Sequence, residues 1–228
     1  MSPVRVRARR GEGDKLREEI LAAVSDLLDE TNDEAAVSIR AIAERVGVSP
    51  PSIYRHFADK EAMLGAVCAE VFVQLTDGIA ESVATAKTPL DALAHAGRCY
   101  VEFGLEHPEH YRLVFMRPPF HDSIDHSDDL AALTIGVIPE SHRLFGGEAL
   151  AGSEAFKALF DLVAAVLADV PKRRRPDVLT MTTSMWAAMH GIVSLRISKP
   201  DFVWPSVDEQ IGAVLWPWRA LLAKQKGA

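Results

Sequence analysis

Residues 38–57, SIRAIAERVGVSPPSIYRHF, decide the fold of the N-terminal part of the chain. Ser38 is a favourable N-cap, and the apolar residues after it are spaced i, i+3, i+4 and i+7 (Ile39, Ile42, Ala43 and Val46), which predicts a short amphipathic helix. Gly47 stands where a left-handed residue ends a helix. Ser49 is expected to cap a second helix with Pro50 in its first position, where the missing N–H costs nothing.

Two short helices joined by a glycine-containing turn form a helix-turn-helix. The second helix is predicted over Pro50–Phe57, and only Ile53 and Phe57 are expected to face inward. Its remaining side chains are small, polar or aromatic and include one arginine. Hydroxyls and rings of this kind contact phosphates, and arginine contacts a guanine edge. We therefore interpret residues 38–57 as a reader of duplex DNA, the alternative being ordinary solvated residues of a small bundle.

Three further residues extend the predicted DNA surface. Lys60 lies at the N-terminus of a long helix, where helix dipole and ammonium together favour phosphate. Ser38 and Arg40, at the start of the helix predicted over residues 38–46, are placed to reach the same DNA backbone.

The order of these residues resembles TetR-type (tetracycline-repressor-like) transcriptional regulators over about Lys15–Leu64. The family pattern is matched by Gly47-Val48-Ser49, by Ile53-Tyr54-Arg55-His56-Phe57 and by Lys60-Glu61. The resemblance implies two groups of DNA contacts. Phosphates are contacted by Tyr54, His56 and Lys60, and bases are faced by Pro50, Pro51, Ser52 and Arg55.

The double proline departs from the family pattern. Pro50 and Pro51 remove two N–H donors, so recognition is expected to depend more on Ser52 and Arg55. The basic arm before the first helix, with Arg5, Arg7, Arg9 and Arg10, is either a minor-groove contact or an unstructured tail.

The composition is that of an ordinary soluble globular protein. The chain has 228 residues, 48% hydrophobic and 25% charged. A net charge of −7 excludes a general polyanion binder, so any DNA contact must use a local basic surface. Cys68 and Cys99 are interpreted as buried thiols in a reducing compartment. There is no secretory signal and no run of roughly 20 apolar residues, so we expect a cytoplasmic protein without a membrane partner.

Helical periodicity runs through almost the whole chain and predicts an all-α fold of about nine helices. The predicted helices cover residues 15–30, 38–46, 50–57, 59–85, 90–106, 109–116, 153–170, 177–198 and 207–224, and Pro217 is expected to kink or divide the last one. Residues 120–152 are expected to hold a loop with short helices. The expected divisions are a basic arm (1–14), a helix-turn-helix domain (15–58) and a ligand-binding and dimerisation domain (59–228).

Two C-terminal segments resemble one class of TetR-type ligand domains. Residues 185–191, MWAAMHG, match its Trp-x-x-x-His-Gly signature, and residues 107–115, HPEHYRLVF, match the segment before it, with His110 where leucine is usual. His190 and Trp186 share a helix face. They are either packing residues or part of a cavity for a small-molecule effector. The other candidate lining residues are Phe103, Tyr111, Phe115, Phe156, Phe160 and Met189.

The last two predicted helices, 177–198 and 207–224, carry more apolar surface than one neighbour can bury. The family pairs these helices with their symmetry mates. A homodimer of this kind sets its recognition helices about 34–36 Å apart, which matches successive major grooves of a palindromic operator.

No nucleophile motif, phosphate loop or paired catalytic carboxylates stand out, so an enzyme is not expected. The run from His121 to Asp129 contains two histidines and four aspartates and is interpreted as a solvated acidic turn, with a divalent metal as the alternative. We therefore expect no resident metal or other cofactor. The predicted function is a ligand-responsive transcriptional regulator, more specifically a repressor. The alternatives are a regulator without a small-molecule ligand and a helical metalloenzyme using His121 and Asp125.

Overall fold

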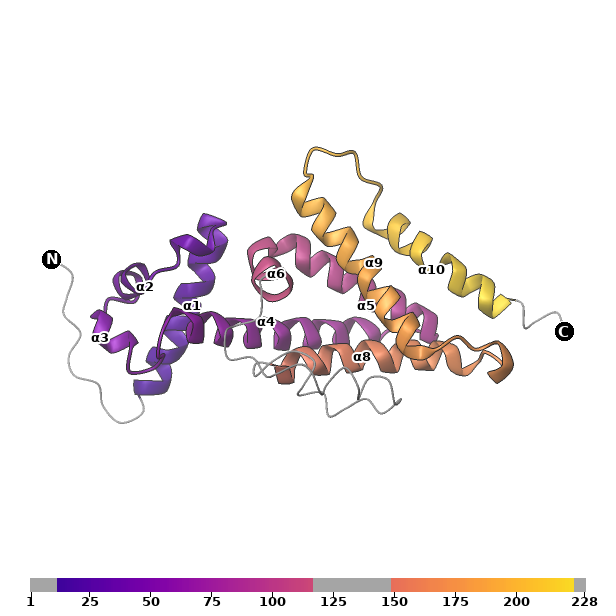
Figure 1. Ribbon diagram of the computed structural model, residues 1–228, viewed down its shortest axis with the longest axis horizontal. Coiled ribbons are helices and arrows are strands. Elements are labelled where there is room, and N and C mark those ends of the chain that lie inside the picture. The colour runs from indigo at the N-terminus through magenta and orange to yellow at the C-terminus, as the bar shows by residue number, and fades with distance from the viewer. Residues whose placement is uncertain (1–11, 117–148, 224–228) are drawn as a thin grey trace, which may run out of the picture. The chain divides into compact units, whose positions relative to one another are not determined.

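The computed structural model describes residues 12–116 and 149–223, and every regular element in this part is helical (Figure 1). Nine are α-helices and two are short 3-10 helices. In chain order they are α1 (Glu12–Thr31), η1 (Glu34–Ala36), α2 (Ile39–Val46), α3 (Pro50–Ile53), α4 (Lys60–Val83), α5 (Pro89–Glu106), α6 (Pro108–Phe115), α8 (Ala149–Ala168), η3 (Lys172–Arg174), α9 (Val178–Ser198) and α10 (Val207–Ala223). The predicted all-α class is confirmed.

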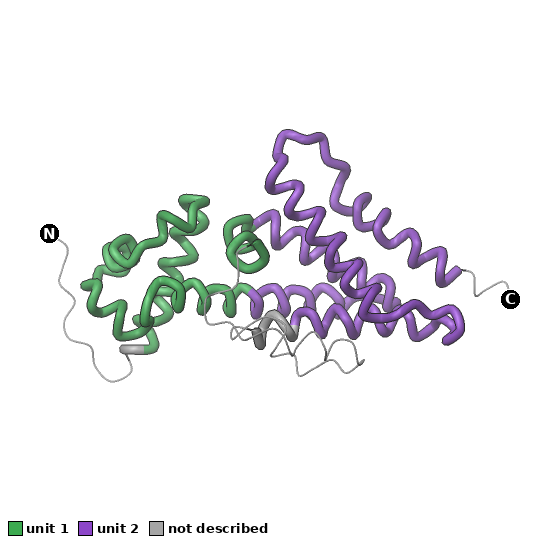
Figure 2. Tube along the Cα trace, in the orientation of Figure 1, with its two compact units in different colours: residues 1–71, 107–150 green, residues 72–106, 151–228 purple. Residues whose placement is uncertain are grey.

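The chain forms two compact units, coloured separately in Figure 2. Unit 1 comprises Met1–Val71 and His107–Leu150, and unit 2 comprises Phe72–Glu106 and Ala151–Ala228. The long helix α4 contributes its first half to unit 1 and its second half to unit 2. The division between the units in this helix falls after Val71, later in the chain than the predicted domain boundary after residue 58. The predicted boundary separates a DNA-binding part from a ligand-binding part and stays a prediction.

The core of unit 1 is built from the apolar faces of its helices. Ile53 and Phe57 point inward as predicted, with 0% and 5% of their surface exposed. The other buried side chains of this core include Ile20, Leu21, Val24, Leu28, Val37, Ile42, Met63, Leu64 and Val67. Helix α6 adds the fully buried Tyr111. Burial of a side chain such as Leu or Ile contributes about 1.5–3 kcal/mol, so this core holds the short helices in place.

The turn between α2 and α3 depends on Gly47. Its φ of +74° is left-handed, as the sequence predicts. The amide of Val48 donates to the carbonyl of Ala43, and the amide of Gly47 donates to that of Glu44. These two bonds form a Schellman motif, which satisfies the last carbonyls of α2 and turns the chain into α3.

We expect Gly47→Ala to destabilise the protein by about 1 kcal/mol, because a left-handed conformation costs a side-chain-bearing residue that amount. A Cβ at this position would meet nothing within 4 Å, so the cost is one of backbone conformation and not of collision. Gly47→Asn, which tolerates the left-handed region better, should lose less. Urea unfolding of the two variants measures the difference, and equal losses would contradict this explanation.

Unit 2 is organised around α5, which packs against α9 and α10. Its core contains Leu93, Val101, Met185, Met189, Val193, Ile211, Leu215 and Trp218. Gly97 lets α5 and α9 approach closely. A Cβ built on it would lie 3.1 Å from the sulfur of Met189 and 3.6 Å from the terminal carbon of Met185.

Gly97→Leu is expected to lower the free energy of unfolding by about 2 kcal/mol, because extra side-chain volume in a packed interface forces neighbours to shift. The control is Gly212→Ala on α10, where a Cβ meets nothing within 4 Å. That variant should gain slightly from helix propensity. Chemical denaturation of both variants tests the close approach, which a neutral Gly97→Leu would disprove.

The helix predicted over Pro50–Phe57 is shorter than expected, because α3 ends at Ile53. The carbonyl of Ile53 accepts from the amides of both His56 (2.9 Å) and Phe57 (3.1 Å), which closes the last turn. Helix α10 runs through Pro217, so this proline does not divide the last helix, and the alternative of a kink stays a prediction. Pro217 and Ala213, whose carbonyl loses its donor, are both exposed, so water can replace the missing N–H.

Helices α4 and α9 are long and apolar enough, by length and composition alone, to cross a membrane. Buried core helices share this composition. Both helices contribute core side chains, Met63, Leu64 and Val67 from α4 and Met185, Met189 and Val193 from α9. Packing within the units therefore accounts for part of their apolar surface. Residues 120–148 of the predicted loop and most of the basic arm lie outside the described residues, and positions 149–152 belong to α8.

Candidate nucleic-acid interface

The first helix of the helix-turn-helix is capped as predicted. The Ser38 side chain accepts a hydrogen bond from the amide of Ala41 at 3.2 Å, and the residue is exposed. A hydroxyl that accepts in a cap still has its own hydrogen to donate. Ser38 can therefore cap α2 and donate to a phosphate at the same time, and the exposed Arg40 stands two residues later.

A chain of polar side chains runs along one side of α3. The hydroxyls of Ser49 and Ser52 lie 3.1 Å apart, and the Arg55 guanidinium donates to the Ser52 hydroxyl at 3.1 Å. Ser49 occupies the N-cap position but makes no side-chain cap bond. Part of the reason is that Pro50 and Pro51 have no N–H for it to accept. The hydroxyl instead contacts Ser52, and this three-residue chain holds the exposed Arg55 in one orientation.

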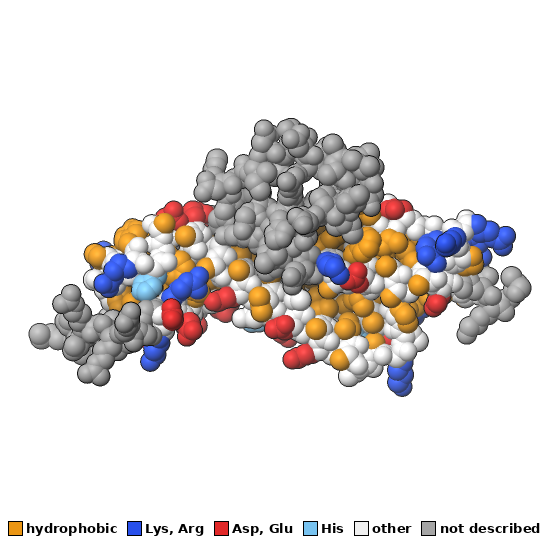
Figure 3. All heavy atoms as spheres, turned by 90° about the horizontal axis from the view of Figure 1, so that it is seen from below, with side chains coloured by type: hydrophobic (Ala, Val, Ile, Leu, Met, Phe, Trp, Pro, Cys, Tyr) orange, Lys and Arg blue, Asp and Glu red, His pale blue; other side chains and the backbone are white. Residues whose placement is uncertain are grey.

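The other predicted DNA residues surround this chain. Pro50 and Pro51 are exposed, and Tyr54 has 54% of its surface accessible. His56 is half-buried. On the face of the molecule shown in Figure 3, a histidine in unit 1 lies between groups of basic side chains. The short α3 thus exposes hydroxyl, phenol and guanidinium groups together.

Lys60 is less free than the sequence suggested. It is half-buried, and its ammonium donates to the backbone carbonyl of Glu34 at 2.7 Å. The start of α4 is already capped by Asp59, whose carboxylate accepts from the amide of Ala62 at 2.8 Å. An ammonium has three donors, so Lys60 retains capacity for a phosphate while it anchors α4 to η1.

Basic residues also fix the helices of unit 1. Arg45 of α2 forms a two-pronged ion pair with Glu30 of α1, and Asp26 lies 3.6 Å from the same guanidinium. This pair lowers the pKa of Glu30 through its hydrogen bond to Arg45. Arg17 lies over the ring of Phe57, 5.0 Å from its centroid. These two arginines therefore contact other elements of unit 1, although both are exposed, as Arg40 and Arg55 are.

Two family models match this chain. The first, described as bacterial regulatory proteins of the tetR family, covers residues 32–67 and includes the whole helix-turn-helix. The second, the tetracyclin repressor-like C-terminal domain, covers residues 93–211, which is more than half of the chain. The chain belongs to the TetR family. It is a DNA-binding transcriptional regulator, as the sequence predicts.

Individual relatives agree with this assignment. YobS of Bacillus subtilis, described as an uncharacterized HTH-type transcriptional regulator, is 25% identical over 179 residues, which cover 76% of this chain and 91% of YobS. FasR of Mycolicibacterium smegmatis, an HTH-type transcriptional activator, is 29% identical over 102 residues, 45% of this chain and 46% of FasR. A TetR family transcription regulator from Marinobacter aquaeolei shares the fold, with a TM-score of 0.57 and 19% identity over 93% of this chain and 98% of that one.

Six of the eight candidate effector residues of this TetR-family chain lie in unit 2. Phe103 is on α5, Phe156 and Phe160 are on α8, and Trp186, Met189 and His190 are on α9. Met189 is buried and the other five are half-buried. The rings of Phe156 and Trp186 meet edge to face, with centroids 6.0 Å apart. Burial lowers the pKa of His190, so it is a neutral polar group beside aromatic ones at pH 7.

The other two candidates, Tyr111 and Phe115, lie on α6 in unit 1. Their rings are tilted against each other with centroids 5.1 Å apart, and Tyr111 has only 1% of its surface exposed. Unit 1 thus contains these two rings as a packed pair, and the structure does not gather all eight candidates within one unit.

The residues before this pair differ from their sequence interpretation. His107 and His110 stand at the start of a helix, a position that favours capping or surface residues. His110 is instead buried, with its Nδ1 3.0 Å from a carboxylate oxygen of Asp29 on α1. Burial lowers the pKa of His110, while Asp29 opposes that shift. His107 occupies the N-cap position of α6 without a side-chain cap bond. Sequence spacing within one helix carries no sign of Asp29, so this contact could not be predicted.

Proposed function

We propose that this TetR-family regulator is a homodimeric repressor that binds a palindromic operator with α3 and is released by a small apolar ligand. One observation carries the proposal: the exposed face of α3, on which Ser52 holds Arg55 beside the exposed Tyr54. That face stands on a turn fixed by Gly47. The proposed compartment is the cytoplasm, where DNA and effector meet.

The proposed contacts divide by chemistry. Arg55 reads a base edge in the major groove, with Ser52 setting its orientation. Tyr54, His56 and Lys60 contact phosphates, and Ser38 and Arg40 reach the same backbone from the start of α2. Pro50 and Pro51 face the bases with apolar rings and provide no N–H donor.

The proposed dimer uses α9 and α10. Helix α10 buries Ile211, Leu215 and Trp218, yet Trp216 on its other side has 68% of its surface exposed. Leu195 of α9 is 51% exposed. Exposed large apolar side chains on two adjoining helices are typical of an interface. A two-fold axis through these helices pairs the two helix-turn-helix domains, one for each half-site of the operator.

The proposed effector is a small apolar molecule that contacts the aromatic residues of α5, α8 and α9. Apolar side chains gather on the face of unit 2 that Figure 3 presents. The ring pair of Phe156 and Trp186 offers apolar contacts, and neutral His190 offers one polar anchor. Release of DNA requires only that the ligand bind one of two conformations more tightly.

A mobility-shift assay with the DNA flanking the gene, at a stated salt concentration, tests the proposal. We expect one shifted species that unlabelled flanking DNA removes and unrelated DNA does not. A reporter driven by the same DNA should be lower when the protein is present. A higher signal would make the protein an activator, as FasR is named, and no specific shift would refute operator binding.

A second candidate is a DNA-binding regulator without a small-molecule ligand. The near-complete burial of Tyr111 and Met189 favours it, because buried rings and thioethers are typical of a filled core. A thermal-shift screen of apolar compounds distinguishes the two candidates. A compound that raises the melting temperature and weakens operator binding supports the effector. Unchanged melting temperatures across the screen favour regulation by a partner protein or by protein level.

No enzymatic activity is proposed. Among the described residues, polar and titratable side chains come together at the helix-turn-helix and around Asp29. Neither group contains a nucleophile activated by a base. The loop residues proposed for a metalloenzyme, His121 and Asp125, lie outside the described residues.

A further inference from the structure

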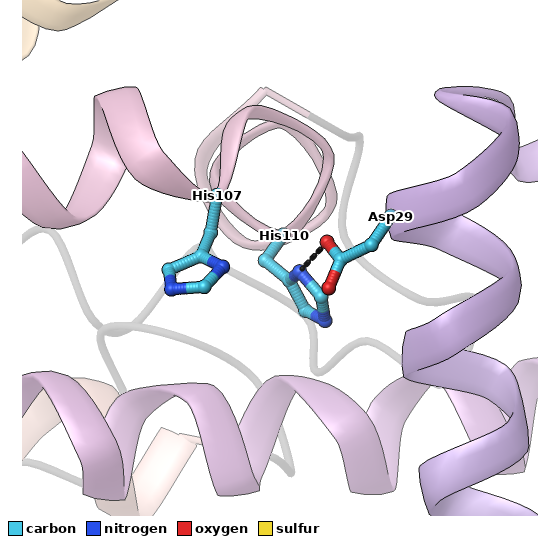
Figure 4. Close-up of side chains that lie close together, drawn as sticks. All are labelled: Asp29, His107 and His110. Carbon is cyan, nitrogen blue, oxygen red and sulfur yellow. Dashed lines mark ion pairs between the residues drawn. The ribbon is translucent and has the colours of Figure 1, made fainter.

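Three side chains that favour metal ions meet inside unit 1. Asp29 comes from α1, His107 precedes α6, and His110 lies in its first turn. One ligand atom of each lies within 4.8 Å of the other two. In Figure 4 the His110 imidazole lies beside the Asp29 carboxylate, and one ring nitrogen of His107 is turned toward His110.

The surroundings of the cluster differ from those of a solvated surface group. The His110 side chain is only 8% exposed, while that of Asp29 is 48% exposed. The rings of His107 and His110 are perpendicular, with centroids 5.8 Å apart. The cluster therefore has a buried side that fixes His110 and an open side through which an ion can arrive.

The distances suit a small ion. Bonds of about 2.0 Å in a tetrahedral zinc site place neighbouring ligand atoms about 3.3 Å apart. The Nδ1 of His110 and the Oδ1 of Asp29, 3.0 Å apart, are already near that spacing. The remaining separations are no longer than 4.8 Å. To reach that spacing, the half-exposed Asp29 side chain and the half-buried His107 ring must rotate as an ion binds.

We propose that Asp29, His107 and His110 bind a divalent transition-metal ion, of which Zn²⁺ is the best match, with water completing the coordination. Imidazole and carboxylate together suit zinc and its neighbours, whereas Mg²⁺ and Ca²⁺ prefer oxygen ligands. This differs from the sequence expectation of no metal. The reason is that Asp29 is 78 residues before His107 in the chain, so no local spacing motif exists.

Such an ion joins α1 to α6, both in unit 1. Since it binds the folded arrangement and not the separated ligands, it stabilises unit 1 by mass action. The site is independent of operator binding: the inference holds even if the protein is not the proposed repressor, because its test uses no DNA.

The experiment uses the full chain after treatment with a chelator. Cobalt(II) absorption and zinc calorimetry should show one tight site per chain, and Zn²⁺ should raise the melting temperature. Asp29→Asn and His107→Ala change side chains that are at least partly exposed, so both variants should fold. Each should weaken binding at least tenfold and abolish the thermal shift. Removal of a residue that only supports a ligand typically weakens metal binding roughly 10–100-fold. Removal of a ligand itself should therefore weaken binding by at least the lower figure.

Two matched controls separate this cluster from other sites. Asp26→Asn removes another exposed carboxylate of α1 and should leave binding unchanged. His121→Ala combined with His126→Ala removes the loop histidines and should also leave it unchanged. Tight binding that the loop variant abolishes, or that survives both Asp29→Asn and His107→Ala, would overturn the proposal. Absence of tight binding would reduce the cluster to an ion pair of Asp29 and His110.

Discussion

Arg55→Ala is expected to bind the operator roughly a hundredfold more weakly than the wild type. A good arginine–guanine contact contributes about 1–3 kcal/mol, and a dimer loses it at two half-sites. A total of about 3 kcal/mol corresponds to two orders of magnitude. Because Arg55 is oriented by Ser52 at 3.1 Å, Ser52→Ala should cause a smaller loss of the same kind. Titrations of operator DNA at fixed salt measure both.

The specificity of the Arg55 effect is as informative as its size. Binding to unrelated DNA should fall much less, because phosphate contacts dominate it. Arg173→Ala, which removes an exposed arginine of η3, should change neither affinity. Tyr54→Phe removes one hydroxyl at a residue with 54% exposure and should weaken specific and unrelated DNA alike. If Arg55→Ala and Tyr54→Ala both leave operator binding intact, α3 is not the reading helix.

The parts of the interface that could be predicted from sequence are local. Ser38 and Gly47 act on atoms within five residues of themselves, so cap and turn follow from residue type and order. The end of α3 at Ile53 is also local, but it depends on which amides reach one carbonyl. Periodicity carries no information about that choice, so the helix was predicted four residues too long.

Contacts between distant segments were not predictable in this way. Arg45 with Glu30, Lys60 with Glu34 and His110 with Asp29 all join elements far apart in the chain. A helical pattern identifies the buried face of a segment but does not show which other segment packs against that face. For that reason the candidate effector residues were correctly placed on apolar helices, yet they divide between two units.

Trp216→Glu is expected to convert the proposed dimer to a monomer. Trp216 is 68% exposed on α10, opposite the buried Leu215 and Trp218. An interface tryptophan commonly contributes 2 kcal/mol or more, and a two-fold axis repeats the loss. The dissociation constant of the dimer should therefore rise by about three orders of magnitude, from roughly 4 kcal/mol. Sedimentation at micromolar concentration measures it.

Val73→Glu is the matched control, since Val73 is 54% exposed on α4, which is not one of the proposed interface helices. It should remain dimeric, whereas Trp216→Glu should keep its helical content and lose operator affinity. The reason for that loss is geometric. One helix-turn-helix domain contacts one half-site, and only a dimer whose recognition helices are about 34–36 Å apart contacts two successive major grooves. A monomeric Trp216→Glu variant with full operator affinity would mean that one helix-turn-helix domain suffices for binding. A Trp216→Glu variant that stays dimeric would place the interface on other helices.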